Sequence, residues 1–286
     1  MMQDHPDAIV STDWLASCLG DPDVRIVDSS WYLPAQKKNG RWEFERARIP
    51  GARFFDIDQI AETESGLPHT LPTPEYFAER VTELGINNKH QIVTYDGLGI
   101  FSAARAWWMF RVFGHDKVAV LDGGITKWRN EVRPTEEGTP TVQASADPPF
   151  HATYDASMFR SLDDIRANVE SHAEQIADAR SAGRFNGTEP EPREGMRSGH
   201  IPGSCNLPYG DLVDPKSGTL LETDQLESAF ARAGLSLDKP VVTSCGSGVT
   251  AAILSLSLHI LGHEDHALYD GSWSEWGGRD DTPIEV

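Results

Sequence analysis

The chain has 286 residues, a length that suits one large domain or two of ordinary size. It carries 25 Lys and Arg residues against 44 Asp and Glu residues, a formal net charge of −19, so we expect it to bind neither nucleic acid nor a membrane surface. Hydrophobic residues make up 39% of the chain, enough for a packed core, and no apolar run approaches the roughly 18 residues of a membrane span.

The cysteines indicate an ordinary reducing compartment. Cys18, Cys205 and Cys245 form an odd, scattered set that fits neither a disulfide framework nor the paired spacing of a metal site. The first residues also lack the basic and apolar regions of a secretory signal. We therefore expect a cytoplasmic protein that holds no metal.

Short motifs recur at an offset of about 150 residues, which indicates a duplicated unit. Ile49-Pro50-Gly51 returns as Ile201-Pro202-Gly203, and Asp122-Gly123 returns as Asp270-Gly271. A repeat of about 130–140 residues has the size of a domain. The stretch between the copies is rich in Pro, Thr, Ala and acidic residues and has no period. The predicted organisation is an N-terminal domain at 1–135, a linker at 136–155 and a C-terminal domain at 156–286.

Apolar runs and amphipathic stretches alternate in each copy. The first copy predicts strands at 25–28, 91–95 and 117–121, with helices at 75–84 and 102–113. The second copy predicts strands at 175–178, 241–244 and 266–269, with helices from 223 to before 234 and at 250–261. This alternation is typical of an α/β fold, a small, mostly parallel sheet with helices on both faces. Sites in such sheets lie at the carboxyl ends of the strands.

The loop after the strand at 241–244 predicts a reactive cysteine. Cys245 is followed by Gly246-Ser247-Gly248-Val249-Thr250 and then by a helix. The glycines allow the backbone to curl so that amides point inward, and the helix start adds a positive dipole end. A cysteine in that setting should exist largely as the thiolate. The alternative is a small, inert buried cysteine.

The matching loop of the first copy begins with Asp96 instead of cysteine. We expect its carboxylate to accept hydrogen bonds from its own loop amides and the first copy to be catalytically silent. Cysteine loops at strand ends also serve phosphatases, which need an Arg six positions after the cysteine. That position is Ala251 here, so a phosphatase is disfavoured.

The Cys245 loop, the duplication and the closing stretch 270–276 together resemble the tandem rhodanese-type sulfurtransferases, and among them the 3-mercaptopyruvate sulfurtransferases, over about residues 14–276. The resemblance implies two rhodanese-like domains with the active cysteine in the second. It implies that sulfur passes from 3-mercaptopyruvate to Cys245 as a persulfide, with release of pyruvate. The sulfur then passes to a thiol such as thioredoxin, or to cyanide, without any cofactor.

The resemblance also assigns roles around Cys245. Arg184 and Arg193 match the substrate-binding pair, and Ser247 matches a catalytic serine that acts with an Asp and a His, here Asp58 and His69. The amides of the loop, from Gly246, Gly248, Val249 and Thr250, would hold the thiolate and then the persulfide. Asp58 could instead cap a turn, and His69 could make a structural hydrogen bond. Arg180 and Arg197, which flank the arginine pair, are expected to be solvated surface charges.

The donor is predicted from the residues after Cys245. Thiosulfate-specific relatives carry basic residues there, whereas Gly246 and Ser247 are small and uncharged. This favours 3-mercaptopyruvate. Two alternatives remain open, thiosulfate as the main donor and a slow persulfide carrier in a sulfur relay.

Overall fold

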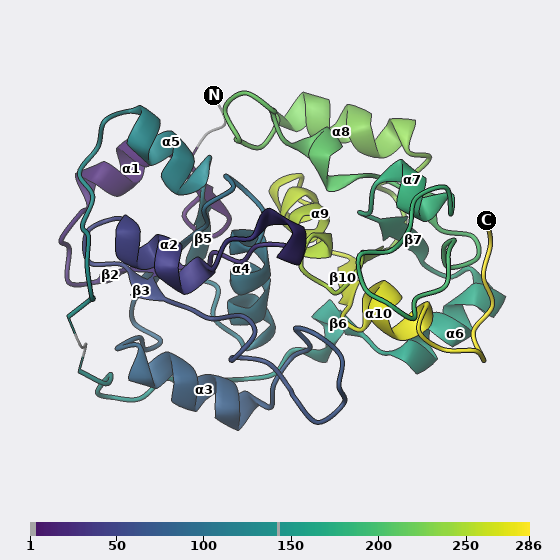
Figure 1. The fold of residues 1–286 in the computed structure, drawn as a ribbon, viewed down its shortest axis with the longest axis horizontal. Coiled ribbons are helices and arrows are strands. Elements are labelled where there is room, and N and C mark those ends of the chain that lie inside the picture. The colour runs from purple at the N-terminus through teal and green to yellow at the C-terminus, as the bar shows by residue number, and fades with distance from the viewer. Residues whose placement is uncertain (1–3, 142–143) are drawn as a thin grey trace. The chain divides into compact units, whose positions relative to one another are not determined.

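The computed structural model describes residues 4–141 and 144–286, so part of the predicted linker, 142–143, and the first three residues lie outside it. The chain divides into two compact units (Figure 1). The first comprises the described residues up to Ala61, Leu71–Asp155 and Asp214–Leu220. The second comprises Glu62–Thr70, Ala156–Val213 and Leu221–Val286. Segments 62–70 and 214–220 therefore each belong to the unit built mainly from the other half of the sequence.

The first unit contains a five-stranded parallel sheet in the order β1-β5-β4-β2-β3. Its strands are β1 (Ile9–Val10), β2 (Val24–Asp28), β3 (Arg53–Phe54), β4 (Gln91–Tyr95) and β5 (Val118–Leu121). Its helices are α1 (Thr12–Ser17), α2 (Gly40–Arg46), α3 (Pro74–Glu83), α4 (Ala103–Val112) and α5 (Gly124–Asn130), with a 3₁₀ turn η1 (Pro34–Gln36).

The second unit repeats this topology with the order β6-β10-β9-β7-β8. Its strands are β6 (Phe159–Arg160), β7 (Gln175–Asp178), β8 (Cys205–Asn206), β9 (Val241–Ser244) and β10 (His266–Tyr269). Its helices are α6 (Leu162–Ser171), α7 (Ala182–Phe185), α8 (Thr223–Arg232), α9 (Ala251–Ile260) and α10 (Ser272–Trp276), with 3₁₀ turns η2 (Ala156–Met158) and η3 (Tyr209–Leu212). β6, β7, β8, β9 and β10 correspond in turn to β1, β2, β3, β4 and β5.

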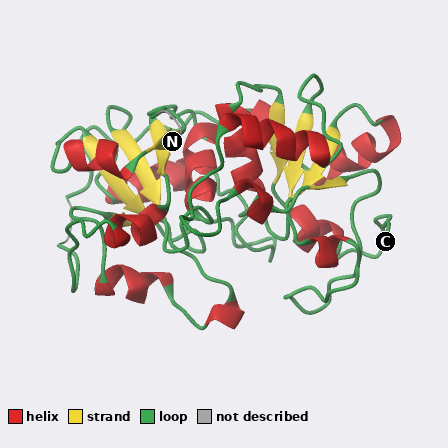
Figure 2. Ribbon diagram, turned by 90° about the horizontal axis from the view of Figure 1, so that it is seen from above, coloured by secondary structure: helices red, strands yellow, loops and turns green. Residues whose placement is uncertain are grey.

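The most apolar helix of each unit packs against the central strands. α4 lies on β4 and β5, and α9 lies on β9 and β10. In α4 the side chains of Trp107 and Trp108 are fully buried, and every residue of α9 from Ala251 to Leu258 is buried. Other helices flank the sheets, as Figure 2 shows. The predicted α/β fold class, with parallel sheets and helices on both faces, is confirmed.

The long predicted elements lie within one residue of the observed bounds, because their apolar runs are buried strands and helices. At α3, Thr73 caps the helix through its hydroxyl, which accepts from the Tyr76 amide at 3.2 Å, and Pro74 takes the first position. The two-residue strands β1, β3, β6 and β8 were not predicted, since two residues carry no period.

The stretch between the two copies packs along the first unit. Arg48 and Glu136 exchange backbone hydrogen bonds of 2.9 Å, and Phe150 is 4% exposed. The amides of Thr153 and Asp155 donate to carbonyls at the end of α4. Within the part of the chain that the structure describes, no helix is both long and apolar enough to cross a membrane.

Candidate active site

Cys245 follows β9 directly and lies at the start of the loop that leads into α9. It is 1% exposed, as expected for a residue beyond the carboxyl end of a central parallel strand. Gly248 has a φ of 75°, a left-handed conformation that glycine adopts at little cost and that curls the loop back toward Cys245. Ser247 and Val249 are 6% and 3% exposed. Cys245, Ser247 and Val249 of the loop are therefore all buried.

The start of α10 holds this loop in place. The Ser272 hydroxyl accepts from the amides of Cys245 at 3.2 Å and Gly248 at 3.1 Å, and it donates to the Tyr269 carbonyl at 2.8 Å. The Ser274 hydroxyl donates to the Gly246 carbonyl at 2.6 Å. We did not single out these serines from the sequence, although both lie in the recurring stretch after Asp270-Gly271.

Other amides of the loop are still available as donors. Within the described residues, the backbone N–H groups of Gly246, Ser247, Val249 and Thr250 donate to no protein acceptor. They precede or open α9, whose N-terminal end adds a positive dipole. Unused amides beside a sulfur atom are suited to stabilise negative charge on it.

Arg184 lies over the loop. It comes from α7, and a methyl group added at Gly246 would lie 2.9 Å from its Nη2 atom. Its Nε and Nη2 atoms donate to Oε2 of Glu191 at 3.1 and 2.5 Å. The Nη1 group is left to donate elsewhere, because Glu191 binds only one edge of the guanidinium.

Glu191 is shared between two arginines. Its side chain is 5% exposed, and its Oε1 atom accepts from Nη1 of Arg180 at 2.7 Å while its Oε2 atom binds Arg184. Sequence reasoning missed Glu191, although it lies in the same segment as Arg184. A carboxylate that binds two guanidinium groups fixes one relative to the other.

Arg180 and Arg197 are not solvated surface charges, so that expectation is wrong. Arg180 is fully buried, pairs with Asp178 through Nε and Nη2, and stacks 4.2 Å from the ring centre of Trp273. Burial lowers the pKa of Arg180, but Asp178 and Glu191 outweigh this and raise the pKa overall. Arg197 donates to the carbonyls of Trp276, Gly277 and Thr282. Arg180 therefore belongs to the packed interior of the second unit, and Arg197 is half-buried and held by backbone carbonyls of that unit.

Arg193 contacts His69. Both residues belong to the second unit, and Nη2 of Arg193 lies 3.3 Å from Nε2 of His69, which is 4% exposed. A guanidinium only donates, so Nε2 of His69 is the acceptor in this contact. The sequence assigned these two residues to different roles, substrate binding and proton transfer, and the structure brings them together.

Asp58 belongs to the first unit. It is exposed, and its Oδ2 atom accepts from Nε1 of Trp31 at 3.0 Å. Its own amide donates to Oδ1 of Asp56 at 3.0 Å, so it lies in a turn. The carboxylate that caps this turn is that of Asp56, which accepts from the amides of Asp58 and Gln59, so Asp58 lies in the turn without capping it.

The first unit carries the corresponding loop with Asp96 in the position of Cys245. Its carboxylate accepts from the amides of Leu98 at 2.8 Å, Phe101 at 2.7 Å and Ala103 at 2.8 Å. Burial raises the pKa of Asp96, and these amides only partly oppose the rise. The carboxylate therefore binds the amides of its own loop, as the comparison of the two loops predicted.

The comparisons with known proteins agree with this duplication. The model of the rhodanese-like domain matches residues 11–131 and again 161–279. The chain is 46% identical to "Thiosulfate/3-mercaptopyruvate sulfurtransferase 1, mitochondrial" of Arabidopsis thaliana, over 98% of this chain and 78% of that protein. It is 43% identical to the 3-mercaptopyruvate sulfurtransferase of Escherichia coli strain K12, over 96% of this chain and 97% of that one.

Among solved structures, the fold is similar to the crystal structure of SseA from Escherichia coli, described as a 3-mercaptopyruvate sulfotransferase with the rhodanese fold. The TM-score is 0.84 at 41% identity, over 93% of this chain and 99% of that chain. The repeated topology, the two matching loops and these similarities have one explanation. The chain belongs to the rhodanese-like domain family, with one copy of the domain in each half of its sequence.

Proposed function

We propose that this protein is a sulfurtransferase that takes sulfur from 3-mercaptopyruvate onto Cys245, releases pyruvate and passes the sulfur to a thiol or to cyanide. The observation that carries this proposal is the place of Cys245, at the end of β9 and directly before residues with unused amides, with Arg184 close to the neighbouring Gly246. The relatives named as 3-mercaptopyruvate sulfurtransferases support the donor.

In the first half-reaction the Cys245 thiolate attacks the sulfur of the donor. An S–S bond forms while the C–S bond breaks, and the electron pair leaves with the carbon as the enolate of pyruvate. A proton then converts the enolate to pyruvate, and sulfur stays on the enzyme as a persulfide. The unused loop amides of Gly246, Ser247, Val249 and Thr250 stabilise the thiolate first and the outer persulfide sulfur afterwards, while the Gly248 amide donates to Ser272.

In the second half-reaction a thiolate acceptor attacks the outer sulfur. The new S–S bond forms on the acceptor, and Cys245 leaves as the thiolate. A reduced thioredoxin or a small thiol has the chemistry for this step, and cyanide would give thiocyanate in the same way.

Arg184 and Arg193 are proposed to bind the carboxylate and keto oxygens of the donor. Glu191 binds the Nε edge of Arg184 and leaves Nη1 for the substrate. His69 accepts a hydrogen bond from Arg193 and can orient that guanidinium. His69 is also proposed to take part in proton transfer to the enolate. Ser247 is proposed to pass a proton to the enolate.

The decisive experiment compares pyruvate release from 3-mercaptopyruvate with sulfur transfer from thiosulfate in wild type, Cys245→Ser and Cys205→Ser. We expect Cys245→Ser to lose both activities and Cys205→Ser to keep them, since Cys205 lies in β8. Full pyruvate release by Cys245→Ser would refute the nucleophile.

Thiosulfate as the main donor is the second candidate, because the name of the Arabidopsis relative includes both donors. A higher kcat/KM on thiosulfate than on 3-mercaptopyruvate would favour it. A slow carrier would show one extra sulfur on Cys245 by mass spectrometry in a single turnover, with little steady-state release of pyruvate.

We also propose a cytoplasmic location, although one plant relative is named as mitochondrial. Fractionation of cells of the source organism followed by immunodetection tests it. Turnover with reduced thioredoxin, compared with that of small thiols at equal thiol concentration, tests the acceptor.

A further inference from the structure

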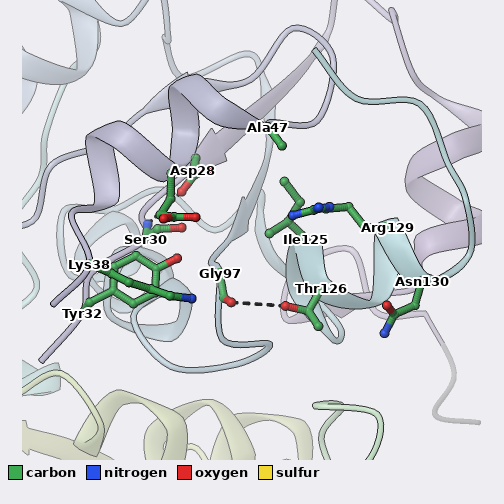
Figure 3. Close-up of a pocket in the computed structure, with 11 residues that line it drawn as sticks. Asp28, Ser30, Tyr32, Lys38, Ala47, Gly97, Ile125, Thr126, Arg129 and Asn130 are labelled. Atoms are coloured by element: carbon green, nitrogen blue, oxygen red, sulfur yellow. Dashed lines mark hydrogen bonds between the residues drawn. The ribbon is translucent and has the colours of Figure 1, made fainter. Parts of the chain in front are cut away.

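The first unit contains a cavity of about 320 Å³ beside the Asp96 loop. The residues that line it include Asp28, Ser30, Tyr32, Gly97, Ile125 and Thr126. Figure 3 shows Asp28, Ser30 and Tyr32 together on one side, and Arg129 and Asn130 on α5 on the other. None of these residues belongs to the candidate active site.

The side of the cavity formed by the end of β2 is equivalent to the end of β7 in the second unit. Asp28 ends β2 and pairs with Tyr95, while Asp178 ends β7 and pairs with Ser244. Each carboxylate accepts from the amide two residues later, which is Ser30 at 2.8 Å in the first unit and Arg180 at 2.9 Å in the second. Ser30 therefore occupies the position of Arg180.

The wall formed by α5 matches the one formed by α10. The Ile125 amide donates to the Asp96 carbonyl at 3.1 Å, as the Trp273 amide donates to the Cys245 carbonyl at 2.9 Å. One residue later, Thr126 donates its hydroxyl to the Gly97 carbonyl, as Ser274 does to Gly246. Ile125 therefore occupies the position of Trp273.

These two replacements account for the cavity. In the second unit the buried guanidinium of Arg180 stacks on Trp273 and pairs with Asp178. In the first unit Ser30 and Ile125 are much smaller, so space opens beside Asp28. The first unit therefore has the carboxylate, Asp28, but has neither a guanidinium in the position of Arg180 nor a ring in the position of Trp273.

Asp28 is 2% exposed and receives its hydrogen bonds from neutral groups, the Ser30 amide and hydroxyl and the Tyr95 hydroxyl. Burial raises the pKa of Asp28 to about 7, with these hydrogen bonds opposing the rise and Asp96 adding to it. Asp28 is therefore mostly ionised at about pH 8. The titratable and charged groups near it are Tyr32, Lys38, Glu43, Tyr95, Asp96 and Arg129.

Two cations lie among the lining residues. Lys38 is exposed, with its Nζ atom 5.3 Å from the ring centre of Tyr32, and Arg129 is exposed on α5. In Figure 3 the Arg129 guanidinium extends over Ile125 toward the space in front of Asp28. A ligand with a carboxylate at its outer end could meet both cations.

We propose that this cavity binds a small zwitterion with a guanidinium group at one end and a carboxylate at the other, the guanidinium on Asp28 and the carboxylate between Lys38 and Arg129. The ligand cation occupies the place that the Arg180 guanidinium holds in the second unit. Free L-arginine has this chemistry and serves as the probe.

Isothermal titration calorimetry with the full chain at about pH 8 tests the proposal. We expect saturable binding of L-arginine with a Kd of about 1 mM or lower. L-citrulline, which replaces the guanidinium with a neutral urea, should bind at least about ten-fold more weakly. Agmatine, which lacks the carboxylate, should also bind more weakly. Equal binding of arginine and citrulline, or no binding of arginine, would overturn the proposal.

Variants locate the site. Asp28→Asn should weaken arginine binding by about ten- to a hundred-fold, while Asp23→Asn, at the exposed residue before β2, should not change it. In Ser30→Arg the new side chain should pair its own guanidinium with Asp28, fill the place of the ligand and abolish binding. A thermal melt of this variant checks that the unit still folds. Unchanged binding in folded Asp28→Asn or Ser30→Arg refutes the site.

Two more variants separate this site from its neighbours. Arg129→Ala should weaken arginine binding and leave agmatine binding unchanged, whereas tighter binding of arginine would show that Arg129 itself competes for Asp28 and would refute the assignment. Cys245→Ser should bind arginine as wild type does, so the outcome does not depend on the proposed sulfur transfer.

Discussion

Glu191→Gln is the sharpest test of how the Cys245 site is built. The wild-type carboxylate binds Arg180 with one oxygen and Arg184 with the other, at distances of 2.5 to 3.1 Å, and is 5% exposed. Glutamine has nearly the same shape but only one acceptor oxygen. Its NH₂ group must therefore face one of the two guanidinium groups, donor against donor.

The magnitude follows from what is lost. A hydrogen bond between charged groups contributes about 1.5–3 kcal/mol, and breaking a buried ion pair costs about 3–5 kcal/mol. Arg180 keeps Asp178 as a partner, and Arg184 is 23% exposed and can turn to water. We therefore expect the variant to lose about 3 kcal/mol of unfolding free energy, which lowers the Tm by roughly 10 °C for a domain of this size.

The kinetic effect should fall mainly on KM. Without Glu191 the guanidinium of Arg184 is no longer fixed over Gly246, so a contact that orients the bound donor is weakened. We expect the KM for 3-mercaptopyruvate to rise roughly ten-fold, with a smaller change in kcat. Steady-state pyruvate release and thermal melts measure both effects. Glu189→Gln, at an exposed neighbour whose carboxylate binds Ser181, is the matched control.

Two results would refute this reasoning. A wild-type Tm in Glu191→Gln would mean that the shared carboxylate does not hold Arg180 and Arg184. A lowered Tm with an unchanged KM would mean that Arg184 does not bind the donor, and the proposed carboxylate contact would then fall to Arg193.

Asp28→Asn should alter how stability depends on pH. The folded-state pKa of Asp28, about 7, lies above its ordinary 3.8, so folding takes up a proton between these values and wild-type stability falls as pH rises through that window. Denaturant melts at about pH 5 and pH 8 should show this difference reduced in the variant by up to about 3 kcal/mol, and an unchanged difference would contradict the pKa. Asp96→Asn should destabilise the first unit by about 1–3 kcal/mol in the same melts, because one NH₂ group would face backbone donors; a wild-type melt would refute the role of its amide bonds. Ser272→Ala should lower kcat and leave the Tm nearly unchanged, since it releases the Cys245 loop. A wild-type kcat in stopped-flow assays, or a large fall in Tm in thermal melts, would contradict this. Gly246→Ala should displace the end of Arg184 and raise KM with an unchanged Tm, and an unchanged KM would show that the two groups do not meet.

Most of the elements that the sequence predicted are those with long apolar runs, whereas α3 was predicted from its Thr73 cap and Pro74. β4, β9, α4 and α9 are buried on nearly every side, so their residues alone specify them. The hydrogen bonds of the Asp96 carboxylate were also predicted from the sequence, because the donors and the acceptor within one loop are close along the chain. Local pattern was sufficient in each of these cases.

What the sequence did not predict depends on contacts between distant residues. The burial of Arg180 requires Trp273, which lies far along the chain, and the pairing of His69 with Arg193 requires segment 62–70 to join the second unit. Glu191 has no local pattern that separates it from any acidic loop residue. The small residues Ser30 and Ile125 suggest a cavity only after their equivalents in the second unit are known.

The chain of charges from Asp178 through Arg180 and Glu191 to Arg184 has a consequence for how the protein meets anions. It contains two positive and two negative groups, so the charges cancel and little field from Arg184 extends beyond its immediate surroundings. A carboxylate that reaches Arg184 is then selected by the direction of the Nη1 hydrogen bonds and not by long-range attraction. Binding through Arg184 should accordingly change little with ionic strength, in a protein whose overall charge of −19 would otherwise repel its substrate most strongly at low salt.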